Sequence, residues 1–272
     1  MKRNTIILAL AAAICTPLAA TAQQVELIAH RGESADAPEN TVAAVQLAWD
    51  RGVPAAEIDV HLTRDDRLLV IHDANTRRTT GVSRVVRESD LADLTGLDAG
   101  SWKAARWRNE RLPTLEQVLA TVPEGRKLYI EVKVGAEAIP ALERAIQLHA
   151  RRVDDLVIIS FQADAIAEAK RRLPEIPAYY LASFKRDSTT GEFSPTVDDL
   201  IRTAKEIRAD GLDLSWNGPV DAAFVRKVKA EGLGMYVWTV DDPEVARRLI
   251  AAGVDGITTN RAEALGRELT GS

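Results

Sequence analysis

The side chains best suited to chemistry begin in a short stretch near residue 30. Residues 28–40 read IAHRGESADAPEN, in which a strand-like apolar run ends in His30 and Arg31. An imidazole titrates near neutral pH, and a guanidinium binds anions through its planar set of N–H donors. A strand that only fills a core has no use for either group at its tip. The stretch therefore indicates an anion-binding site, and we expect Gly32 to let the backbone turn sharply beside it.

Three carboxylates follow in two later strand-like runs. AAEIDV places Glu57 two residues before Asp59, and YIEVK places Glu131 two residues before Lys133. Residues two apart on a strand share a face, so these carboxylates are expected to converge, which is costly unless a cation holds them together. Oxygen ligands favour Mg²⁺ or Ca²⁺ over zinc. The alternative is an ion-pair network with Lys133 and Arg31 and no metal.

A second histidine ends another strand-like run, since His72 is followed at once by Asp73. Two histidines near a carboxylate cluster are suited to proton transfer, with one ring accepting a proton and the other donating one. For each ring, the alternative is a hydrogen-bonded structural role. Arg31 and Lys133 are expected to neutralise a phosphate group, the arginine through its fork and the lysine as a point charge.

Four further residues carry weaker expectations. Glu39 and Asn40 are expected to cap the next helix and to brace the His30 loop rather than to bind metal. His61 is in phase with the carboxylates of its strand, but we expect it to lie past the strand end and to be solvated. Trp238 is a candidate wall of a ligand pocket, with core packing as the alternative.

The elements that must position these residues alternate between strand-like and helix-like from end to end. Eight strands joined by helices predict a parallel sheet, and eight is the count that closes an α/β barrel. Such (β/α)8 TIM barrels place their active sites at the carboxyl ends of the strands. The candidate strands are residues 25–30, 55–60, 127–132, 156–160, 177–182, 209–214, 235–240 and 254–259.

One strand-like run, residues 67–72, departs from this alternation. Only HLTRDD separates it from the second strand, and this connection is too short for a helix, so we expect a hairpin-like extension there. The following segment, residues 74–111, is rich in turn-forming and polar residues. We interpret it as a small insertion over one mouth of the barrel, of the kind that often acts as a lid.

The first 22 residues have the layout of a secretory signal peptide. Lys2 and Arg3 precede an apolar run, and a small-residue site ends at Ala22. A transmembrane anchor is the alternative, but Pro17 interrupts a run that is shorter than the ~20 apolar residues of a spanning helix. We therefore expect an exported protein, periplasmic or secreted, with residues 23–272 as one catalytic domain and no membrane insertion after cleavage.

Composition narrows the class of partner. The formal net charge is −5, and no basic cluster is present, which argues against binding to nucleic acid or to an anionic membrane. The single cysteine, Cys15, lies in the predicted signal peptide, which excludes a thiolate site from the mature chain. The sequence also lacks G-x-S-x-G, G-x-G-x-x-G and P-loop motifs. A small-molecule substrate is the remaining expectation, and the sequence is silent on oligomeric state.

A set of motifs in order along the chain resembles the glycerophosphodiester phosphodiesterase family. Any one motif would be a weak signal, but the set spans nearly the whole predicted mature chain with consistent spacing. The motifs are HRG at 30–32, APENT at 37–41, EIDV at 57–60, LLVIHD at 68–73, LPTLEQVL at 112–119, EVK at 131–133, VWTVDD at 237–242 and VDGITTN at 254–260.

This resemblance implies a TIM barrel that hydrolyses glycerophosphodiesters to sn-glycerol 3-phosphate and an alcohol, with a divalent metal ion, Mg²⁺ or Ca²⁺. It leaves open which histidine is the acid and whether a cyclic phosphate forms. By position, the family's metal ligands match Glu57, Asp59 and Glu131, its general acid and base match His30 and His72, and its phosphate contacts match Arg31 and Lys133.

Two other functions compete with this interpretation. The first is a phospholipase-D-like or phosphoinositide-cleaving enzyme on the same barrel, which the absence of an evident lipid-docking helix disfavours. The second is a non-catalytic phosphodiester-binding protein, which the presence of every metal-binding and proton-transfer position disfavours.

Overall fold

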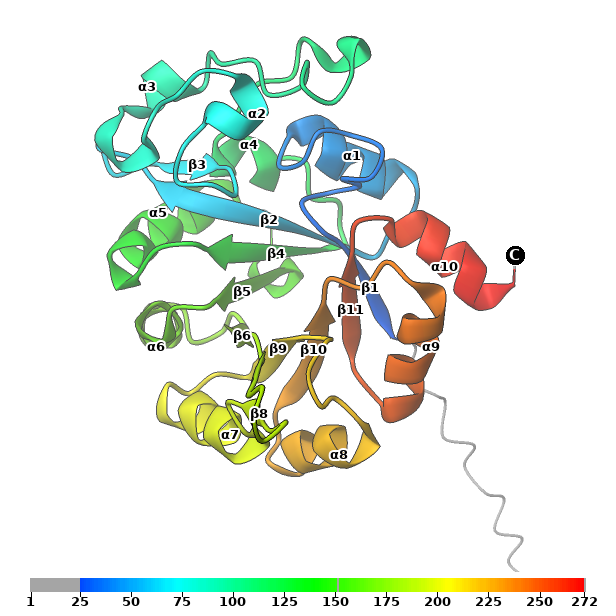
Figure 1. The fold of residues 1–272 in the computed structure, drawn as a ribbon. Helices are drawn as coiled ribbons and strands as arrows, with labels where there is room; N and C mark the ends of the chain where they lie inside the picture. The colour runs from blue at the N-terminus through cyan, green and yellow to red at the C-terminus, as the bar shows by residue number, and fades with distance from the viewer. Residues whose placement is uncertain (1–24, 151, 272) are drawn as a thin grey trace, which may run out of the picture.

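The computed structural model describes residues 25–150 and 152–271, so the predicted signal peptide lies outside the described residues. Eight parallel strands form a closed barrel (Figure 1), which confirms the predicted fold class. Around the barrel the strands follow the order β1, β11, β10, β9, β6, β5, β4 and β2, and β2 pairs with β1 to close it. Their bounds are β1 Glu26–Ala29, β2 Ala55–Leu62, β4 Lys127–Val132, β5 Leu156–Ser160, β6 Ala178–Ala182, β9 Gly211–Ser215, β10 Gly234–Trp238 and β11 Gly256–Thr259.

Helices form a ring outside the strands (Figure 1). Their ends follow local sequence rules. In α9, Asp242 accepts hydrogen bonds from the first turn, Pro243 begins the helix, and Gly253 ends it in the left-handed conformation. Within the described parts of the chain, no helix combines the length and apolar character needed to cross a bilayer. The ring consists of α1 Val42–Asp50, α4 Leu115–Leu119, α5 Ile139–His149, α6 Ala163–Arg172, α7 Val197–Glu206, α8 Ala222–Ala230, α9 Pro243–Ala252 and α10 Ala262–Thr270.

The extra strand predicted after β2 is present as β3, Leu68–Val70. It pairs antiparallel with the end of β2, where His61 faces Leu69 across the ladder. This confirms the hairpin-like extension. The pairing also carries β2 on to Leu62, two residues beyond the predicted end, because the additional backbone hydrogen bonds stabilise extended structure there.

Residues 74–111 lie beside the ends of β2 and β3 (Figure 1). Lys103 Nζ donates to the Ser34 carbonyl at 2.7 Å, which ties this segment to the loop after β1. The segment has short helices and helps form a small core outside the barrel, so it is more ordered than its sequence suggested; its role as a lid stays a prediction. The helices are α2 Arg77–Thr80, α3 Leu91–Leu94 and 3-10 turns at Val86–Glu88 and Ala105–Trp107, and the core comprises Leu69, Ile71, Val86, Leu91, Leu94, Ala99 and Leu112.

The two ends of the barrel interior differ in chemistry. At the amino-terminal end, Tyr129, Tyr179 and Tyr236 pack together, the last two with stacked rings 4.6 Å apart. Gly256 leaves room for this packing, since a Cβ there would lie 2.4 Å from the Tyr236 ring. The carboxyl ends of the strands instead carry buried acidic side chains. Chemistry is therefore expected at the carboxyl-terminal end.

Candidate active site

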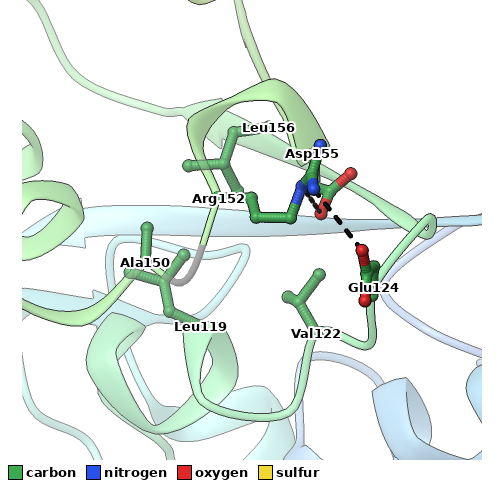
Figure 2. Close-up of a pocket in the computed structure, with 7 residues that line it drawn as sticks. All are labelled: Leu119, Val122, Glu124, Ala150, Arg152, Asp155 and Leu156. Carbon is green, nitrogen blue, oxygen red and sulfur yellow. Dashed lines mark hydrogen bonds and ion pairs between the residues drawn. The ribbon is translucent and has the colours of Figure 1, made fainter.

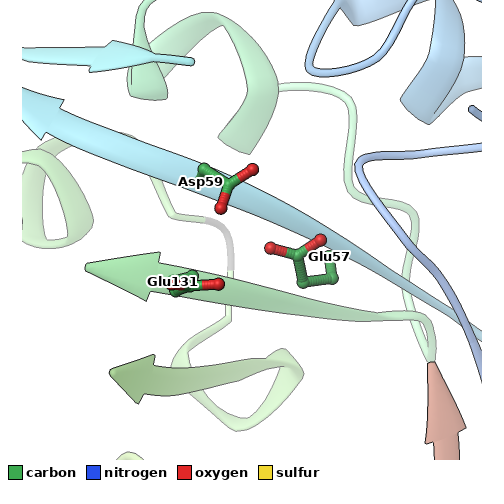
Figure 3. Close-up of side chains that lie close together, drawn as sticks. All are labelled: Glu57, Asp59 and Glu131. Carbon is green, nitrogen blue, oxygen red and sulfur yellow. The ribbon is translucent and has the colours of Figure 1, made fainter. Parts of the chain in front are cut away.

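Three buried carboxylates gather at the carboxyl-terminal end of the barrel. Glu57 and Asp59 project from β2, and Asp59 is in register with Glu131 on the neighbouring strand β4. One oxygen of each lies within 4.8 Å of the others. Figure 3 shows the three side chains close together on the two strands. Their relative exposures are 2% for Glu57, 0% for Asp59 and 8% for Glu131. Strand alternation and the parallel register together bring the three predicted metal ligands to one point.

The charges around this cluster are incompletely balanced by the protein. Burial, followed by the neighbouring carboxylates, raises the pKa of Glu57 and of Glu131. Burial would also raise the pKa of Asp59, but the charges of Lys133 and Arg31 outweigh it and lower that pKa. Among the described residues, the buried Glu57 Oε1 has no hydrogen-bond partner. An all-oxygen donor set with an unsatisfied buried oxygen fits a hard divalent cation.

The His30 ring follows β1 directly and is held by residues from the end of the chain. His30 Nδ1 lies 2.7 Å from Asn260 Oδ1, and Asn260 Nδ2 donates to Asp241 at 2.7 Å. Because the amide oxygen can only accept, Nδ1 carries the proton and the other ring nitrogen, Nε2, keeps a lone pair. Burial and then the Arg31 charge lower the pKa of His30 to about 4, although the Asn260 bond opposes the shift. His30 is therefore a neutral imidazole at neutral pH.

The His72 ring follows β3 and has a charged partner. His72 Nδ1 lies 2.7 Å from Asp73 Oδ1, and Arg78 Nε on α2 donates to the other oxygen of Asp73 at 2.7 Å. The Arg78 hydrogen bond, with the His72 bond as a further cause, lowers the pKa of Asp73 to about 2. Asp73 is therefore an ionised carboxylate that orients the His72 ring.

The two predicted phosphate-binding cations adjoin the acidic cluster. Arg31 Nε lies 3.3 Å from Asp59, and Arg31 Nη1 lies 2.8 Å from Glu39. Lys133 Nζ lies 2.7 Å from Glu131 and 3.2 Å from Asp59. Both side chains also line the central cavity described below. The geometry thus contains the ion-pair network considered as the alternative to a metal, together with donors that face the cavity.

The backbone after β1 is bent at the expected glycine. Gly32 has φ +78°, and a Cβ there would lie 2.4 Å from the backbone of Ala44 in α1, so no other residue fits without movement.

The prediction that Glu39 and Asn40 cap the next helix is wrong, because Thr41 caps α1 through its side-chain oxygen. Asn40 instead donates to Asp59 at 2.7 Å and accepts from the Asp59 amide, so it braces the site.

The expectation for His61 is also wrong. His61 lies within β2 rather than past its end, because β3 extends that strand, and it is 7% exposed rather than solvated. Its Nε2 lies 3.0 Å from the carbonyl oxygen of His72. His61 therefore supports the backbone that carries His72.

A cavity of about 200 Å³ opens among these groups. Trp238 lines it and also packs against the buried cluster that contains the three tyrosines, so its role as the wall of a ligand pocket stays a prediction. Its indole Nε1 donates to the carbonyl oxygen of Asp213 at 3.1 Å, and the Phe161 ring meets it edge-on at 5.4 Å. Asp59 lies next to the cavity in the acidic cluster. The lining comprises His30, Arg31, Glu57, His72, Glu131, Lys133, Ile159, Phe161, Leu181, Asp213, Trp238, Thr239 and Thr258.

Sequence reasoning missed three polar residues of this region. Asn260 and Asp241 lie in the VDGITTN and VWTVDD motifs, so their positions just after β11 and β10 were available as a signal. Asp213 lies in phase with the inward face of β9, where burial and then the Glu131 charge raise its pKa. An acidic residue inside an otherwise apolar strand was the signal in that case.

A second cavity, of about 210 Å³, lies near the amino-terminal ends of β4 and β5 (Figure 2). Arg152 there lies 3.5 Å from carboxylates of Glu124 and Asp155. Leu119, Val122 and Leu156 supply apolar walls. This cavity has no histidine in its lining, and its carboxylates are paired with Arg152. The two predicted catalytic histidines and the carboxylate triad lie at the other end of the barrel.

Comparisons with known proteins agree with this geometry. A model of the glycerophosphoryl diester phosphodiesterase family matches residues 30–264. The glycerophosphodiester phosphodiesterase of Caldanaerobacter subterraneus subsp. tengcongensis is 32% identical over 243 residues, covering 88% of this chain and 95% of that protein. A glycerophosphodiester phosphodiesterase of Bacillus subtilis is 26% identical, with 96% of each chain covered.

A solved structure is also similar. It is that of an Oleispira antarctica phosphodiesterase in complex with the product sn-glycerol-3-phosphate. The two chains are 29% identical, the similarity covers 91% of this chain and 97% of that one, and the TM-score is 0.80. The match to the family model extends from His30 through α9 and into α10. On this evidence the chain belongs to the glycerophosphoryl diester phosphodiesterase family.

Proposed function

We propose that this protein hydrolyses glycerophosphodiesters to sn-glycerol 3-phosphate and an alcohol, with a bound divalent metal ion. One observation carries the proposal: a buried triad of carboxylates, two differently paired histidines and two cationic side chains meet around a single cavity. The family membership and the product named for the Oleispira antarctica structure support the substrate class.

The residues fit the metal ion that the family implies. Glu57, Asp59 and Glu131 would hold it, either Mg²⁺ or Ca²⁺, since all three offer oxygen ligands from a buried position. When bound, such an ion stabilises negative charge on phosphate oxygens and lowers the pKa of a bound hydroxyl group. Arg31 and Lys133 would bind the remaining phosphate oxygens through charge-assisted hydrogen bonds.

We assign the two histidines opposite roles on the basis of their hydrogen-bond partners. His30, neutral with a free Nε2, would accept the proton of the attacking group, which is water or the neighbouring glycerol hydroxyl. His72, backed by the Asp73 carboxylate, would enter the reaction protonated and give its proton to the departing alcohol oxygen. After product release, the proton gained by His30 and the proton lost by His72 are exchanged with solvent.

Two further proposals concern regions that the site does not include. Export to the periplasm or the medium rests on residues 1–22, and a cleaved amino terminus after Ala22 in the secreted protein would test it.

Residues 74–111 would influence which alcohol group of the substrate is accepted. Exchange of this segment for that of a relative with another preference should change the ranking of substrates, and an unchanged ranking would contradict the proposal.

The reaction is tested by release of sn-glycerol 3-phosphate from glycerophosphocholine, glycerophosphoethanolamine and glycerophosphoinositol. We expect release that EDTA abolishes and that Mg²⁺ or Ca²⁺ restores. Glu57→Ala, Asp59→Ala and Glu131→Ala should each weaken binding of the metal in a calorimetric titration. Absence of release by the folded, metal-loaded protein would favour a lipid substrate or a binding role instead.

A further inference from the structure

Asp213 is a buried carboxyl group for which the proposed reaction has no use. It lies on the inward face of β9 and is 1% exposed, yet it lines the active-site cavity. Its Oδ1 is fully buried and accepts no hydrogen bond from any described residue. A buried polar atom without a partner is costly and uncommon in native proteins. A ligand in the cavity is the obvious source of the missing donor.

The position of Asp213 divides the cavity into two ends. β9 is separated from β4 by β6 and β5, so Asp213 enters the cavity from a different part of the barrel wall than Glu131 does. Leu181 on β6 and Trp238 on β10 line the cavity from the two strands beside β9. The Trp238 indole also holds the Asp213 carbonyl. One end therefore carries cations and the acidic triad, and the other carries apolar walls with one carboxyl oxygen.

These two ends match the two parts of a glycerol phosphate group. The phosphate belongs with Arg31 and Lys133, for the reasons given above. A glycerol group attached to it offers hydroxyl donors and apolar CH edges, which suit a carboxyl oxygen between Leu181 and Trp238. A quaternary ammonium head group has no N–H donor, so it would leave Asp213 Oδ1 without a hydrogen bond.

We propose that Asp213 is the residue that selects glycerol esters, with Oδ1 accepting a hydrogen bond from a hydroxyl of the substrate's glycerol group. The inference rests on the proposed function, because it takes the phosphate position from that reaction. A site built to bind a hydroxyl discriminates strongly against the analogue that lacks it, since the buried acceptor is then left unpaired.

The test compares glycerophosphocholine with its 1-deoxy and 2-deoxy analogues, each lacking one glycerol hydroxyl. In the wild-type protein, kcat/KM should fall roughly ten- to a hundredfold for the analogue that lacks the bonded hydroxyl. Asp213→Ala should lower kcat/KM for glycerophosphocholine by a similar factor and leave that analogue unaffected, so the selectivity collapses. Asp213→Asn, which keeps one acceptor oxygen, should lose less. Equal losses on all substrates would overturn the proposal.

Two controls separate this role from others. Calorimetric binding of Mg²⁺ or Ca²⁺ should be unchanged in Asp213→Ala, and a loss of metal binding would overturn the proposal in favour of a metal ligand. Glycerophosphopropanol, with a neutral alcohol, should respond to the substitution as glycerophosphocholine does. A loss confined to the choline ester would overturn the proposal by showing that Asp213 recognises the head group.

Two measurements do not depend on turnover. If the wild-type protein released no product, binding of sn-glycerol 3-phosphate and of propyl phosphate would still test Asp213, since only the former should weaken in Asp213→Ala. Equal effects on both would reject the role. The thermal midpoint of the ligand-free Asp213→Ala protein should equal or exceed that of wild type, because an unpaired buried group is removed; a marked decrease would indicate a structural role instead.

Discussion

His30 and His72 each have a hydrogen bond at Nδ1, but the groups that bond the two rings differ in charge. His30 bonds a neutral amide, Asn260, whereas His72 bonds an ionised carboxylate, Asp73. The amide orients the His30 ring and opposes the lowering of its pKa, but burial outweighs this effect and keeps the ring neutral. The Asp73 carboxylate orients the His72 ring. This difference between the partners is the basis on which we propose one ring as the base and the other as the acid.

The supporting groups also come from different distances along the chain. Asn260 and Asp241 reach His30 from the last two strand ends, 230 residues from His30 in the case of Asn260. Asp73 is the neighbour of His72, and Arg78 follows within one short helix. Arg78 also donates twice to Glu39, which in turn pairs with Arg31. One partly exposed arginine thus contacts the carboxylate partners of both His72 and Arg31, the proposed phosphate-binding residue.

Removal of either imidazole ring should have the largest effect on turnover. His30→Ala and His72→Ala should each lower kcat by roughly 10²- to 10⁴-fold, because positioned acids and bases contribute about that much. A p-nitrophenyl ester of glycerol phosphate needs no acid to expel its leaving group, so it should restore much of the rate of His72→Ala but not that of His30→Ala.

Metal binding serves as the control for both variants and should persist in a calorimetric titration. Rescue of His30→Ala in place of His72→Ala would reverse the assignment of acid and base. Near-full turnover of both variants would reject two-histidine catalysis altogether.

Giving each histidine the type of hydrogen-bond partner that the other has should lower kcat/KM by an intermediate amount. Since the pKa of His30 is lowered to about 4, its neutral form persists above that pH, and the acid limit of kcat/KM from this ring should lie near pH 4. Asn260→Asp adds a negative charge, which should raise the pKa of His30, so activity should be lost selectively toward acidic pH.

Asp73→Asn is the opposite exchange, since it replaces the carboxylate that lies 2.7 Å from His72 Nδ1 with a neutral amide. kcat/KM should fall roughly ten- to a hundredfold, because a hydrogen bond to a charged group is lost. A pH profile of kcat/KM for the wild type and Asn260→Asp checks the first prediction, and kcat/KM of Asp73→Asn checks the second. An acid limit that does not move in Asn260→Asp would indicate that residue 260 only positions the His30 ring.

Loss of Arg78 should have the smallest effect. Its side chain is 43% exposed, and ion pairs with such exposure contribute modestly, so Arg78→Ala should lower kcat/KM only about two- to fivefold. Arg78→Lys should recover part of this loss. The neighbouring Arg77→Ala is the matched control and should behave as wild type, and an equal loss in both alanine variants would reject a specific role for Arg78.

Much of the site followed from local sequence rules, and particular residues show where those rules stop. Alternation along a strand was enough to group Glu57 with Asp59, and Glu131 with Lys133. The same rule misplaced His61, because the true end of β2 depends on pairing with β3 and not on the residues of β2 alone. Asn40 was assigned to a helix end by its type, whereas Asp59, nineteen residues away, provides its partner.

By itself, the sequence determined the alternation of eight strands with helices. It also determined the strand face that carries the acidic residues and the positions of His30 and His72 at the ends of strand-like runs. These depend on the period of a strand and on residue type, both of which are local. The tertiary structure decided which groups meet: Asn260 with His30, Arg78 with both Asp73 and Glu39, and Asp213 with the cavity that the two histidines line. Closure of the barrel sets these contacts, because it joins β1 to β11 and to β2 and so brings distant strand ends to one mouth.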